Sequence, residues 1–458
     1  MSCKVRGQIL LWLGLVTLLV TSLAAGAIQD EYILRCSPTA VSGVVSRHGM
    51  TLVRSLEEST YGVYLVRGPA GAAPIQYMSE VSADPDVAAV EPNGDVVVPE
   101  SPVGPQLNQS TASILDTLAN RTVISFFGSP VLSSYVHQPA AVLIRNAEAH
   151  QFFATGTGIV AVIDTGVDPN HPVLQASLVP GFDFTRNVAG IPSEFADLSQ
   201  STASILDQST ASILDQNTIV VLNQSTASIL DQSTARILDT TQVPQAFGHG
   251  TMLAGIIHLV APTAQIMPLK AFKANGTSNV FDILRAIYYA VDHGAKVINM
   301  SFSLVSPSPE FLQAVNFATE SGVICVSSAG NMGKKTLVFP AAYKNVLGIA
   351  STNNLDVRST FSNFGAALVH LAAPGEGIIT TYPGKHYAAG WGTSFSTPFV
   401  SGAAALLLQV EPAITQVHVF DGLSHARLLS RDLGWGRLDS YAALFDRVKV
   451  KPPGAPAP

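Results

Sequence analysis

The sequence contains few cysteines and few charged side chains. Its three cysteines, Cys3, Cys36 and Cys325, are too few in 458 residues for a disulfide framework. Charged residues make up 12% of the chain against 47% hydrophobic ones, which indicates a large buried core and excludes an intrinsically disordered chain. The 25 basic residues form no cluster in the body of the chain and are outnumbered by 32 acidic ones. A nucleic-acid partner, which requires a positive surface, is therefore not expected.

Long hydrophobic runs are also lacking, except at the N-terminus. Residues 1–27 combine Lys4 and Arg6 with an apolar stretch over 9–23 and with Ala25-Gly26-Ala27, a pattern typical of a cleaved secretory signal peptide. A single membrane anchor is the alternative. We expect a secreted, extracellular protein (periplasmic if the source is a Gram-negative bacterium) with no membrane association after signal cleavage.

The chain carries a short internal repeat. The octapeptide Gln-Ser-Thr-Ala-Ser-Ile-Leu-Asp occurs at 109–116, 200–207, 208–215 and 224–231, with a variant at 232–239. Identity this close indicates recent duplication. Because long surface loops cost little extra closure entropy, we interpret the insertion at 200–239 as a tolerated loop. A flap that reaches over a cleft or binds a partner is the alternative.

Residues 140–445 alternate short apolar runs with amphipathic segments. Strands are predicted over 159–163, 265–269, 296–300, 323–327 and 346–350, and helices over 140–153, 250–259, 280–294 and 310–320. Such βα units predict an α/β fold in which a mostly parallel sheet has helices on both faces. Ligand sites in these sheets lie at the carboxyl ends of the strands.

The length of the chain predicts two or three separately folded pieces. Residues 28–97 predict a small α+β unit, with strands at 32–34, 51–53, 62–66 and 87–93 and a helix at 73–82. Residues 98–139 are rich in proline, serine and small residues, which is typical of a linker. Residues 446–458, with four prolines, predict a disordered tail.

One stretch combines a small-residue turn with an apolar helix. Gly392-Thr393-Ser394-Phe395-Ser396-Thr397-Pro398 leads directly into the apolar run 399–408, and we expect Pro398 near the first turn of the helix. Ser394 would then lie where unpaired backbone N–H groups and the positive end of the helix dipole converge. That position suits an oxygen that takes negative charge in a transition state. A simple helix cap is the alternative.

Three further stretches place a polar residue at a strand end or a helix start. Asp164 follows the predicted strand 159–163, His249 opens an apolar helix within Gly248-His249-Gly250, and Asn331 follows the predicted strand 323–327. Each residue alone could be a turn or core residue. Their joint occurrence in the order Asp, His, Asn, Ser favours a catalytic site over chance.

These four stretches resemble the signature motifs of the subtilisin-like serine proteases, the subtilases, over about 140–445. The resemblance implies a subtilisin-like fold and a serine endopeptidase that hydrolyses protein or peptide substrates. Ser394 would be the nucleophile, His249 its general base, and Asp164 the residue that orients the imidazole. Asn331, together with the Ser394 backbone N–H, would hold the oxyanion.

The N-terminal unit resembles the inhibitory prosegment of the subtilases, because it ends in Val90-Glu91-Pro92-Asn93. This resemblance implies a zymogen that processes itself within about 95–139, so that the prosegment would be a partner of the catalytic domain. An unrelated small domain that stays attached is the alternative.

Substrate recognition is implied by the same resemblance. The segments that bind the peptide in this family correspond here to Ser301, Phe302, Ser303, Ala329 and Gly330. The family's glycine-containing run is replaced by Ser303-Leu304-Val305, and we expect a somewhat restricted pocket.

We predict no metal site and no cofactor requirement for the chemistry. The sequence does not decide whether a structural calcium ion is bound. Asp168, Asp183 and Asp197 are candidate oxygen ligands, but scattered acids are usually solvated surface residues. A monomer is expected. Two other classes remain as alternatives: a catalytically silent subtilase-like binding or cell-surface module, and a serine esterase or acyl transferase. The latter would have a Gly-x-Ser-x-Gly elbow, which is absent around Ser394.

Overall fold

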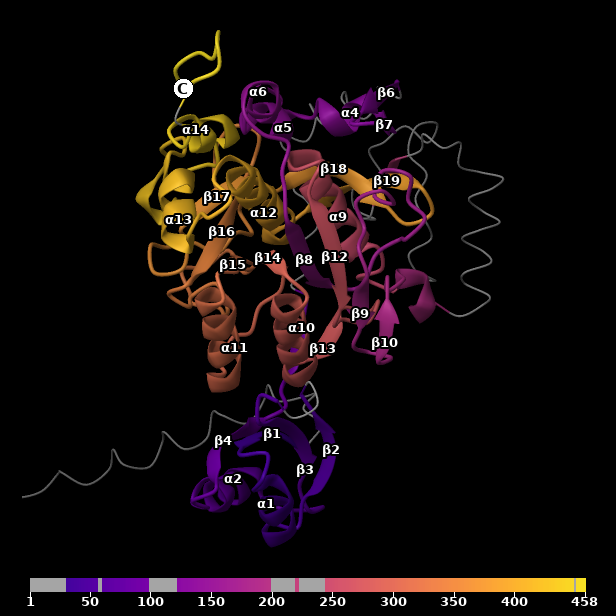
Figure 1. The fold of residues 1–458 in the computed structure, drawn as a ribbon, viewed down its shortest axis with the longest axis vertical. Helices are drawn as coiled ribbons and strands as arrows, with labels where there is room; N and C mark the ends of the chain where they lie inside the picture. The colour runs from indigo at the N-terminus through magenta and orange to yellow at the C-terminus, as the bar shows by residue number, and fades with distance from the viewer. Residues whose placement is uncertain (1–29, 57–59, 99–121, 199–218, 222–243, 449) are drawn as a thin grey trace, which may run out of the picture. The chain divides into compact units, whose positions relative to one another are not determined.

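The computed structural model describes residues 30–56, 60–98, 122–198, 219–221, 244–448 and 450–458, which belong to two compact units (Figure 1). The smaller unit includes Gly62–Asp95 and the residues up to Ser55. The larger unit includes Leu56–Tyr61 and Val96–Pro458. The predicted signal peptide and all copies of the octapeptide lie outside the described residues. Among the residues described, no helix is long and apolar enough to span a membrane.

The smaller unit is a four-stranded antiparallel sheet with two helices. Its elements are β1 (Glu31–Cys36), α1 (Val41–Arg47), β2 (Thr51–Ser55), β3 (Val63–Arg67), α2 (Pro74–Ser82) and β4 (Val87–Pro92), and the strand order is β2-β3-β1-β4. Alternate residues of β1, Tyr32, Leu34 and Cys36, pack in its core with Val44 of α1 and Val81 of α2. The sequence predicted α2 and missed α1, since Gly43 and three valines weaken its helical signal.

The larger unit is built on an eight-stranded sheet. In spatial order its strands are β10 (Val188–Gly190), β9 (Gly181–Asp183), β12 (Gln265–Lys270), β8 (Ile159–Asp164), β14 (Ala295–Met300), β15 (Ile324–Ser328), β16 (Val346–Thr352) and β17 (Leu371–Pro374). Within this sheet, the β10–β9 pair is antiparallel and the other strand pairs are parallel. The sequence-based prediction of an α/β fold with a mostly parallel sheet is confirmed.

The direction of the connections decides which helices cover which face. α9 (His249–Val260) leads from β8 to β12 in one direction, whereas α10 (Val280–Asp292) and α11 (Pro309–Glu320) lead to β14 and β15 in the other. Because such crossovers are right-handed, opposite directions place helices on opposite faces. α12 (Thr393–Val410) packs against α9, so α9 and α12 cover one face, and α10 and α11 cover the other (Figure 1).

Local sequence explains why these helices start where they do. Asn279 caps α10 by accepting a hydrogen bond from the backbone N–H of Asp282, and Ser308 caps α11 through the N–H of Phe311. Pro309 then occupies the first position of α11, where no N–H is needed.

α9 and α12 are buried along nearly their whole length, which fits their predominantly apolar sequences.

The remaining elements are not part of the eight-stranded sheet or of the four helices named above. They are β5 (Asp95–Val97), β6 (Val123–Phe126), β7 (Ser129–Leu132), α4 (Ser133–Val136), α5 (Pro139–Leu143), α6 (Asn146–Phe152), η2 (Glu194–Asp197), β11 (Ile219–Val221), β13 (Thr277–Asn279), β18 (Glu376–Tyr382), β19 (His386–Trp391), α13 (Gln416–Ser424), η3 (Arg431–Leu433) and α14 (Ser440–Phe445). β18 and β19 form an antiparallel pair that β11 joins in parallel. Residues 450–458 form no helix or strand.

Two predictions about residues 98–153 are corrected by the structure. The predicted linker 98–139 contains the β6–β7 hairpin and α4, whose Phe126, Leu132 and Tyr135 are buried in the main core. The predicted helix 140–153 is two helices, α5 and α6. They are separated because Arg145 adopts a left-handed backbone conformation (φ 53°) while its side chain binds Asp439.

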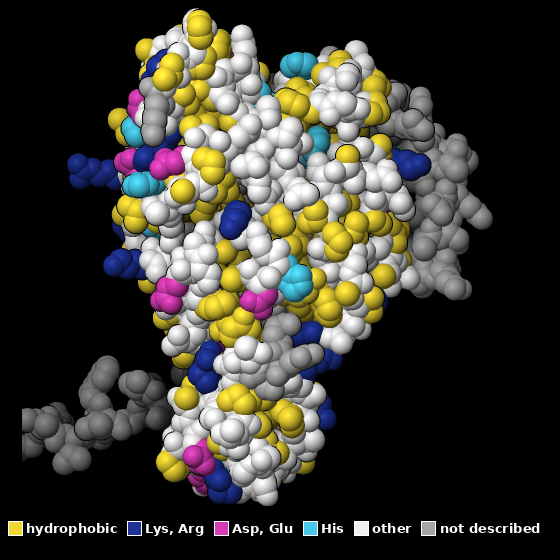
Figure 2. Space-filling model, viewed as in Figure 1, with side chains coloured by type: hydrophobic (Ala, Val, Ile, Leu, Met, Phe, Trp, Pro, Cys, Tyr) yellow, Lys and Arg dark blue, Asp and Glu magenta, His cyan; other side chains and the backbone are white. Residues whose placement is uncertain are grey.

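The surface of the larger unit carries few charges. On the face that Figure 2 shows, the lysine and arginine side chains of the larger unit form no basic stripe, and several at the upper left lie close to acidic side chains. This distribution agrees with the low charged fraction of the sequence.

Candidate active site

The four motif residues lie at the carboxyl edge of the parallel sheet or at helix starts next to it. Asp164 is the last residue of β8, and Asn331 follows the end of β15 by three residues. His249 is the first residue of α9 and Ser394 the second residue of α12. Since α9 and α12 pack side by side on one face, their N-terminal residues approach the end of β8 together.

Asp164 and His249 form a buried hydrogen-bonded pair. Nδ1 of His249 lies 2.8 Å from Oδ1 of Asp164, and the two residues are only 3% and 1% exposed. The backbone N–H of Thr165 donates to the same carboxylate oxygen at 2.8 Å. A carboxylate at Nδ1 fixes the imidazole tautomer so that the proton-accepting nitrogen is Nε2.

This pair depends on a glycine next to the histidine. A Cβ atom at Gly250 would lie 2.1 Å from the backbone oxygen of Gly166 and 3.2 Å from Oδ1 of Asp164. The loops that carry the aspartate and the histidine can therefore approach each other only because residue 250 has no side chain.

Ser394 is the second residue of α12, and the residue after it contacts the histidine. The ring of Phe395, the next residue, packs edge-on against the His249 imidazole with a centroid distance of 5.8 Å. The hydroxyl of Ser394 donates to the backbone oxygen of Ser301 at 3.3 Å. The preceding Gly392 has φ 147°, a conformation that L-residues rarely adopt, and this value sets the direction in which the chain enters the helix.

The helix begins earlier than the sequence suggested. α12 starts at Thr393, so Pro398 is the sixth helical residue rather than a first-turn residue. A proline there has no N–H for the carbonyl oxygen of Ser394, four residues earlier. The hydroxyl of Ser301 donates to that carbonyl at 3.0 Å instead. A side chain from the end of β14 thus supplies the hydrogen bond that the proline cannot make.

The Asn331 amide is oriented by Thr393. Its Oδ1 accepts hydrogen bonds from the Thr393 N–H (2.9 Å) and hydroxyl (2.8 Å), so its NH₂ group points to the other side. A Cβ atom built at Gly392 would lie 3.2 Å from Nδ2 of Asn331 and 3.7 Å from the backbone nitrogen of Ser394. Two N–H donors therefore lie close to one point beside the Ser394 residue.

The candidate substrate-binding residues fall into two groups. Ser303 is partly exposed, and a Cβ atom at Gly330 would lie 3.7 Å from its hydroxyl, so these two residues are neighbours. The side chains of Phe302 and Ala329 are fully buried, and Phe302 packs against Phe272 and Phe311. Ser301 is buried as well, against Ser394. The side chains of these last three residues are therefore not accessible to a ligand.

The acidic residues considered as oxygen ligands bind protein groups. Asp168 accepts from the N–H groups of Asn170 and Gly384, and Asp183 and Asp197 both bind Arg186. Within the described parts of the chain, no group of three or more His, Cys, Asp or Glu residues is arranged to hold a metal ion.

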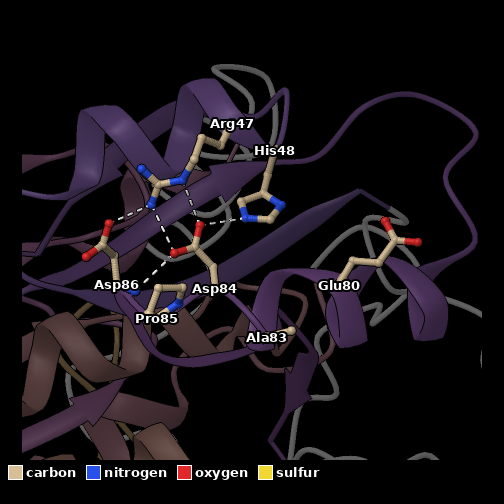
Figure 3. A pocket seen from close by; sticks show the side chains of 7 residues that line it. All are labelled: Arg47, His48, Glu80, Ala83, Asp84, Pro85 and Asp86. Carbon is tan, nitrogen blue, oxygen red and sulfur yellow. Dashed lines mark hydrogen bonds and ion pairs between the residues drawn. The ribbon is translucent and has the colours of Figure 1, made fainter.

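A pocket in the smaller unit is lined by Arg47, His48, Glu80, Ala83, Asp84, Pro85 and Asp86 (Figure 3). Arg47 donates to both carboxylate oxygens of Asp84 at 2.9 Å and to Asp86 at 2.7 Å, while His48 binds Asp84 at 2.9 Å. The hydrogen bonds from Arg47 hold the pKa of Asp84 well below its usual range. These groups join α1 to the turn between α2 and β4.

Comparison with protein-family models matches residues 156–436 to the subtilase family, which is more than half of the chain. The chain belongs to the subtilase family. This subtilase is 38% identical to subtilisin Savinase of Lederbergia lenta over 187 residues, or 39% of this chain and 69% of that protein. It is 30% identical to thermitase of Thermoactinomyces vulgaris over 305 residues, 64% of this chain and 90% of thermitase.

The matched span covers only about half (49%) of the alkaline protease of Shouchella clausii, at 38% identity. Two solved structures share the fold of this subtilase. One is fervidolysin of Fervidobacterium pennivorans, a keratinolytic enzyme. The match covers 92% of this chain and 62% of the fervidolysin chain, with a TM-score of 0.66 at 21% identity. The match to a lanthipeptide protease covers 67% of this chain and 92% of the protease chain, with a TM-score of 0.52 at 24% identity. The predicted family, the subtilisin-like fold and the assignment as a subtilisin-type serine peptidase are thereby confirmed.

Proposed function

We propose that this subtilase is a serine endopeptidase that uses Asp164, His249 and Ser394 as its catalytic triad. The observation that carries the proposal is the buried 2.8 Å hydrogen bond between Nδ1 of His249 and Asp164, together with the contact between His249 and Phe395, the residue after Ser394. Nε2 of His249 would take the proton of the Ser394 hydroxyl as its oxygen attacks the scissile carbonyl carbon, and would return it to the leaving amine. Asp164 would stabilise the imidazolium formed between these steps.

The oxyanion of the tetrahedral intermediate would be bound by two donors. They are the Asn331 NH₂ group and the backbone N–H of Ser394, which lie close to one point beside Gly392. For the corresponding asparagine of subtilisin, removal lowers kcat by about 10²- to 10³-fold, and we expect a loss of this order for Asn331→Ala. The proposed reaction requires no cofactor, because the chain supplies the nucleophile, the base and the oxyanion donors.

The residues at the end of the proposed prosegment support a zymogen. In the larger unit, Val97 pairs with Ser303 in an antiparallel bridge, and the backbone N–H of Val98 donates to the oxygen of Gly276 at 2.9 Å. Val96 and Val98 are 1% and 7% exposed. Ser303 is a predicted substrate-binding residue, so Val96–Val98 would occupy the edge that a substrate peptide uses, and self-cleavage after this segment would free it.

We further propose that the protein is exported, which rests on the signal-peptide pattern in residues 1–27. Its substrates would be proteins or peptides outside the cytoplasm, and its own residues 28–97 would be its first partner.

Self-processing tests the proposed function directly. Residues 28–458 are expressed as wild type and as Ser394→Ala, and their sizes are followed over time together with casein hydrolysis. Only the wild type should shed an N-terminal fragment that contains residues 28–97 and degrade casein. If both proteins stay full length and neither degrades casein, a catalytically silent binding module becomes the better description. Hydrolysis of a short-chain ester without casein hydrolysis would instead indicate an esterase.

A further inference from the structure

A buried glutamate lies behind the proposed Asp–His pair. Glu194 is the first residue of η2, the short 3₁₀ helix that follows β10, and it is 0% exposed. Isolated carboxylates are almost never fully buried, because burial removes their hydration. No sequence motif marks Glu194, and the proposed mechanism does not use it.

The Glu194 carboxylate accepts hydrogen bonds from both loops that carry the pair. The hydroxyl of Thr165 donates to Oε1, and the hydroxyl of Thr251 donates to Oε2. The backbone N–H of Gly250 lies 3.2 Å from Oε1 and also donates to the Thr165 hydroxyl at 3.0 Å. Thr165 directly follows Asp164, whereas Gly250 and Thr251 directly follow His249. One carboxylate therefore joins the end of β8 to the start of α9.

The segment that presents Glu194 is itself anchored to the same place. Asp197, at the other end of η2, binds Nζ of Lys270 at 2.7 Å, and Nζ of Lys270 donates to the backbone oxygen of Thr165 at 2.6 Å. Lys270 is fully buried at the end of β12. Both acidic residues of η2 thus hold Thr165, the residue next to Asp164. Glu194 binds its hydroxyl directly, and Asp197 holds its backbone oxygen through Lys270.

We propose that Glu194 is a positioning residue that sets the distance and angle between Asp164 and His249 by bridging Thr165 and Thr251. The inference rests on the proposed catalytic roles of Asp164, His249 and Ser394. It makes η2 a structural support of the active site, although η2 contributes no group to the reaction. Because small misplacements of reacting groups lower rates strongly, its loss should act on kcat more than on KM.

The charge state of Glu194 should then influence activity. Burial raises its pKa to about 7, although the hydrogen bonds from Thr165 and Thr251 and the charge of Lys270 act in the opposite direction. The ionised form accepts all three hydrogen bonds, so we expect the aligned geometry above this pH. The other titratable groups around it are Asp164 of β8, Lys270 of β12, Asp197 of η2, Tyr382 of β18 and, beyond Gly250, His249 of α9.

The test compares Glu194→Gln with wild type in the full chain, and Glu310→Gln serves as the matched control. Glu310 is equally buried (2% exposed) but lies in the first turn of α11. We measure kcat and KM on a peptide anilide and the labelling rate of Ser394 by a fluorophosphonate between pH 5 and 9. Glu194→Gln should lower kcat and the labelling rate about 10- to 100-fold, with KM within about twofold. Glu310→Gln should stay near wild type.

The pH profile gives a readout that a general loss of stability would not produce. In wild type, full activity requires that two groups lose protons, so log(kcat/KM) should rise with pH more steeply than a slope of one over part of the range. In Glu194→Gln only the histidine remains, and the slope should fall to one. A variant with wild-type kcat and an unchanged slope would overturn the proposal.

A second pair of variants decides the case in which Glu194→Gln does not fold. Thr251→Val removes the hydroxyl that donates to Glu194 and accepts from the Asp168 N–H, and it should lower kcat severalfold. Thr251→Ser keeps both hydrogen bonds and should restore kcat. Equal activity of these two variants would refute the bridge. If wild type is neither active nor labelled by the fluorophosphonate, the proposed function itself fails, and the positioning role fails with it.

Discussion

Replacing Ser301 by alanine should destabilise the start of α12. Its hydroxyl donates to the backbone oxygen of Ser394, which lies in the helix four residues before Pro398. Without the hydroxyl, a buried carbonyl loses a donor that the proline cannot supply. A buried polar group left unsatisfied costs about 1–3 kcal/mol, and we expect Ser301→Ala to lower the free energy of unfolding by this amount.

A double-mutant cycle with Pro398→Ala isolates this effect. An alanine at 398 has an N–H that can bind the Ser394 carbonyl, so Ser301→Ala should cost about 1–2 kcal/mol less in that background. The amide of Asn299 donates to the Ser301 hydroxyl at 3.0 Å, and it loses this acceptor in both backgrounds. Its contribution therefore cancels in the cycle.

Urea denaturation followed by circular dichroism measures these values, with every variant made in a Ser394→Ala background to prevent autolysis. Ser440→Ala is the control, because Ser440 is fully buried and its hydroxyl has no hydrogen-bond partner among the described residues. This control should not destabilise the protein, because it removes a buried hydroxyl without a partner, and it should raise the free energy of unfolding by up to about 1–3 kcal/mol. An equal cost of Ser301→Ala with and without Pro398 would refute the reasoning.

Further predictions concern stability, packing and the repeats. In the Ser394→Ala background, the unfolded chain loses the Glu194 proton near pH 4.5 and the folded chain near pH 7, so stability should fall by up to about 3 kcal/mol between these values. Urea titrations at pH 5 and 8 should show this fall, and Glu194→Gln should abolish it. Gly250→Ala should abolish casein hydrolysis, since its Cβ would overlap the Gly166 carbonyl oxygen; a soluble, active variant would contradict the close approach. Phe126→Ala should cost about 3–5 kcal/mol in the same titrations if residues 123–136 belong to the core. Deleting residues 208–215 should change stability by less than about 1 kcal/mol and leave kcat unchanged, because loop closure depends weakly on length; a large loss would mean that the repeat has a packed role.

The positions of the four motif residues could be predicted because local signals determine them. Each of Asp164 and Asn331 follows an apolar run that forms a buried strand, and parallel strands bring their carboxyl ends to one edge. His249 and Ser394 each precede an apolar run that forms a helix. Because strand ends and helix starts can be predicted from sequence, the locations of the four candidate site residues could be predicted as well.

What could not be predicted depends on contacts between distant residues. At the break between α5 and α6, Arg145 forms an ion pair with Asp439, 294 positions later. The hairpin within the predicted linker is ordered by burial of Phe126 and Tyr135 against the main core. Composition alone indicated a linker there, because serine and proline lower the strand signal whether or not the segment is later buried.

The roles of Glu194 and Ser301 also depend on contacts with residues that are distant in the sequence, unlike the positions of the motif residues. Pro398 would weaken an isolated helix, but Ser301, the residue after β14, supplies the donor to the Ser394 carbonyl. Two loops from different elements would be free to separate, but Glu194 accepts hydrogen bonds from both. No motif indicates either supporting role, since each role requires only one acceptor or one donor at a fixed place. We therefore expect substitutions at Glu194 and Ser301 to impair the proposed chemistry while the four motif residues stay intact.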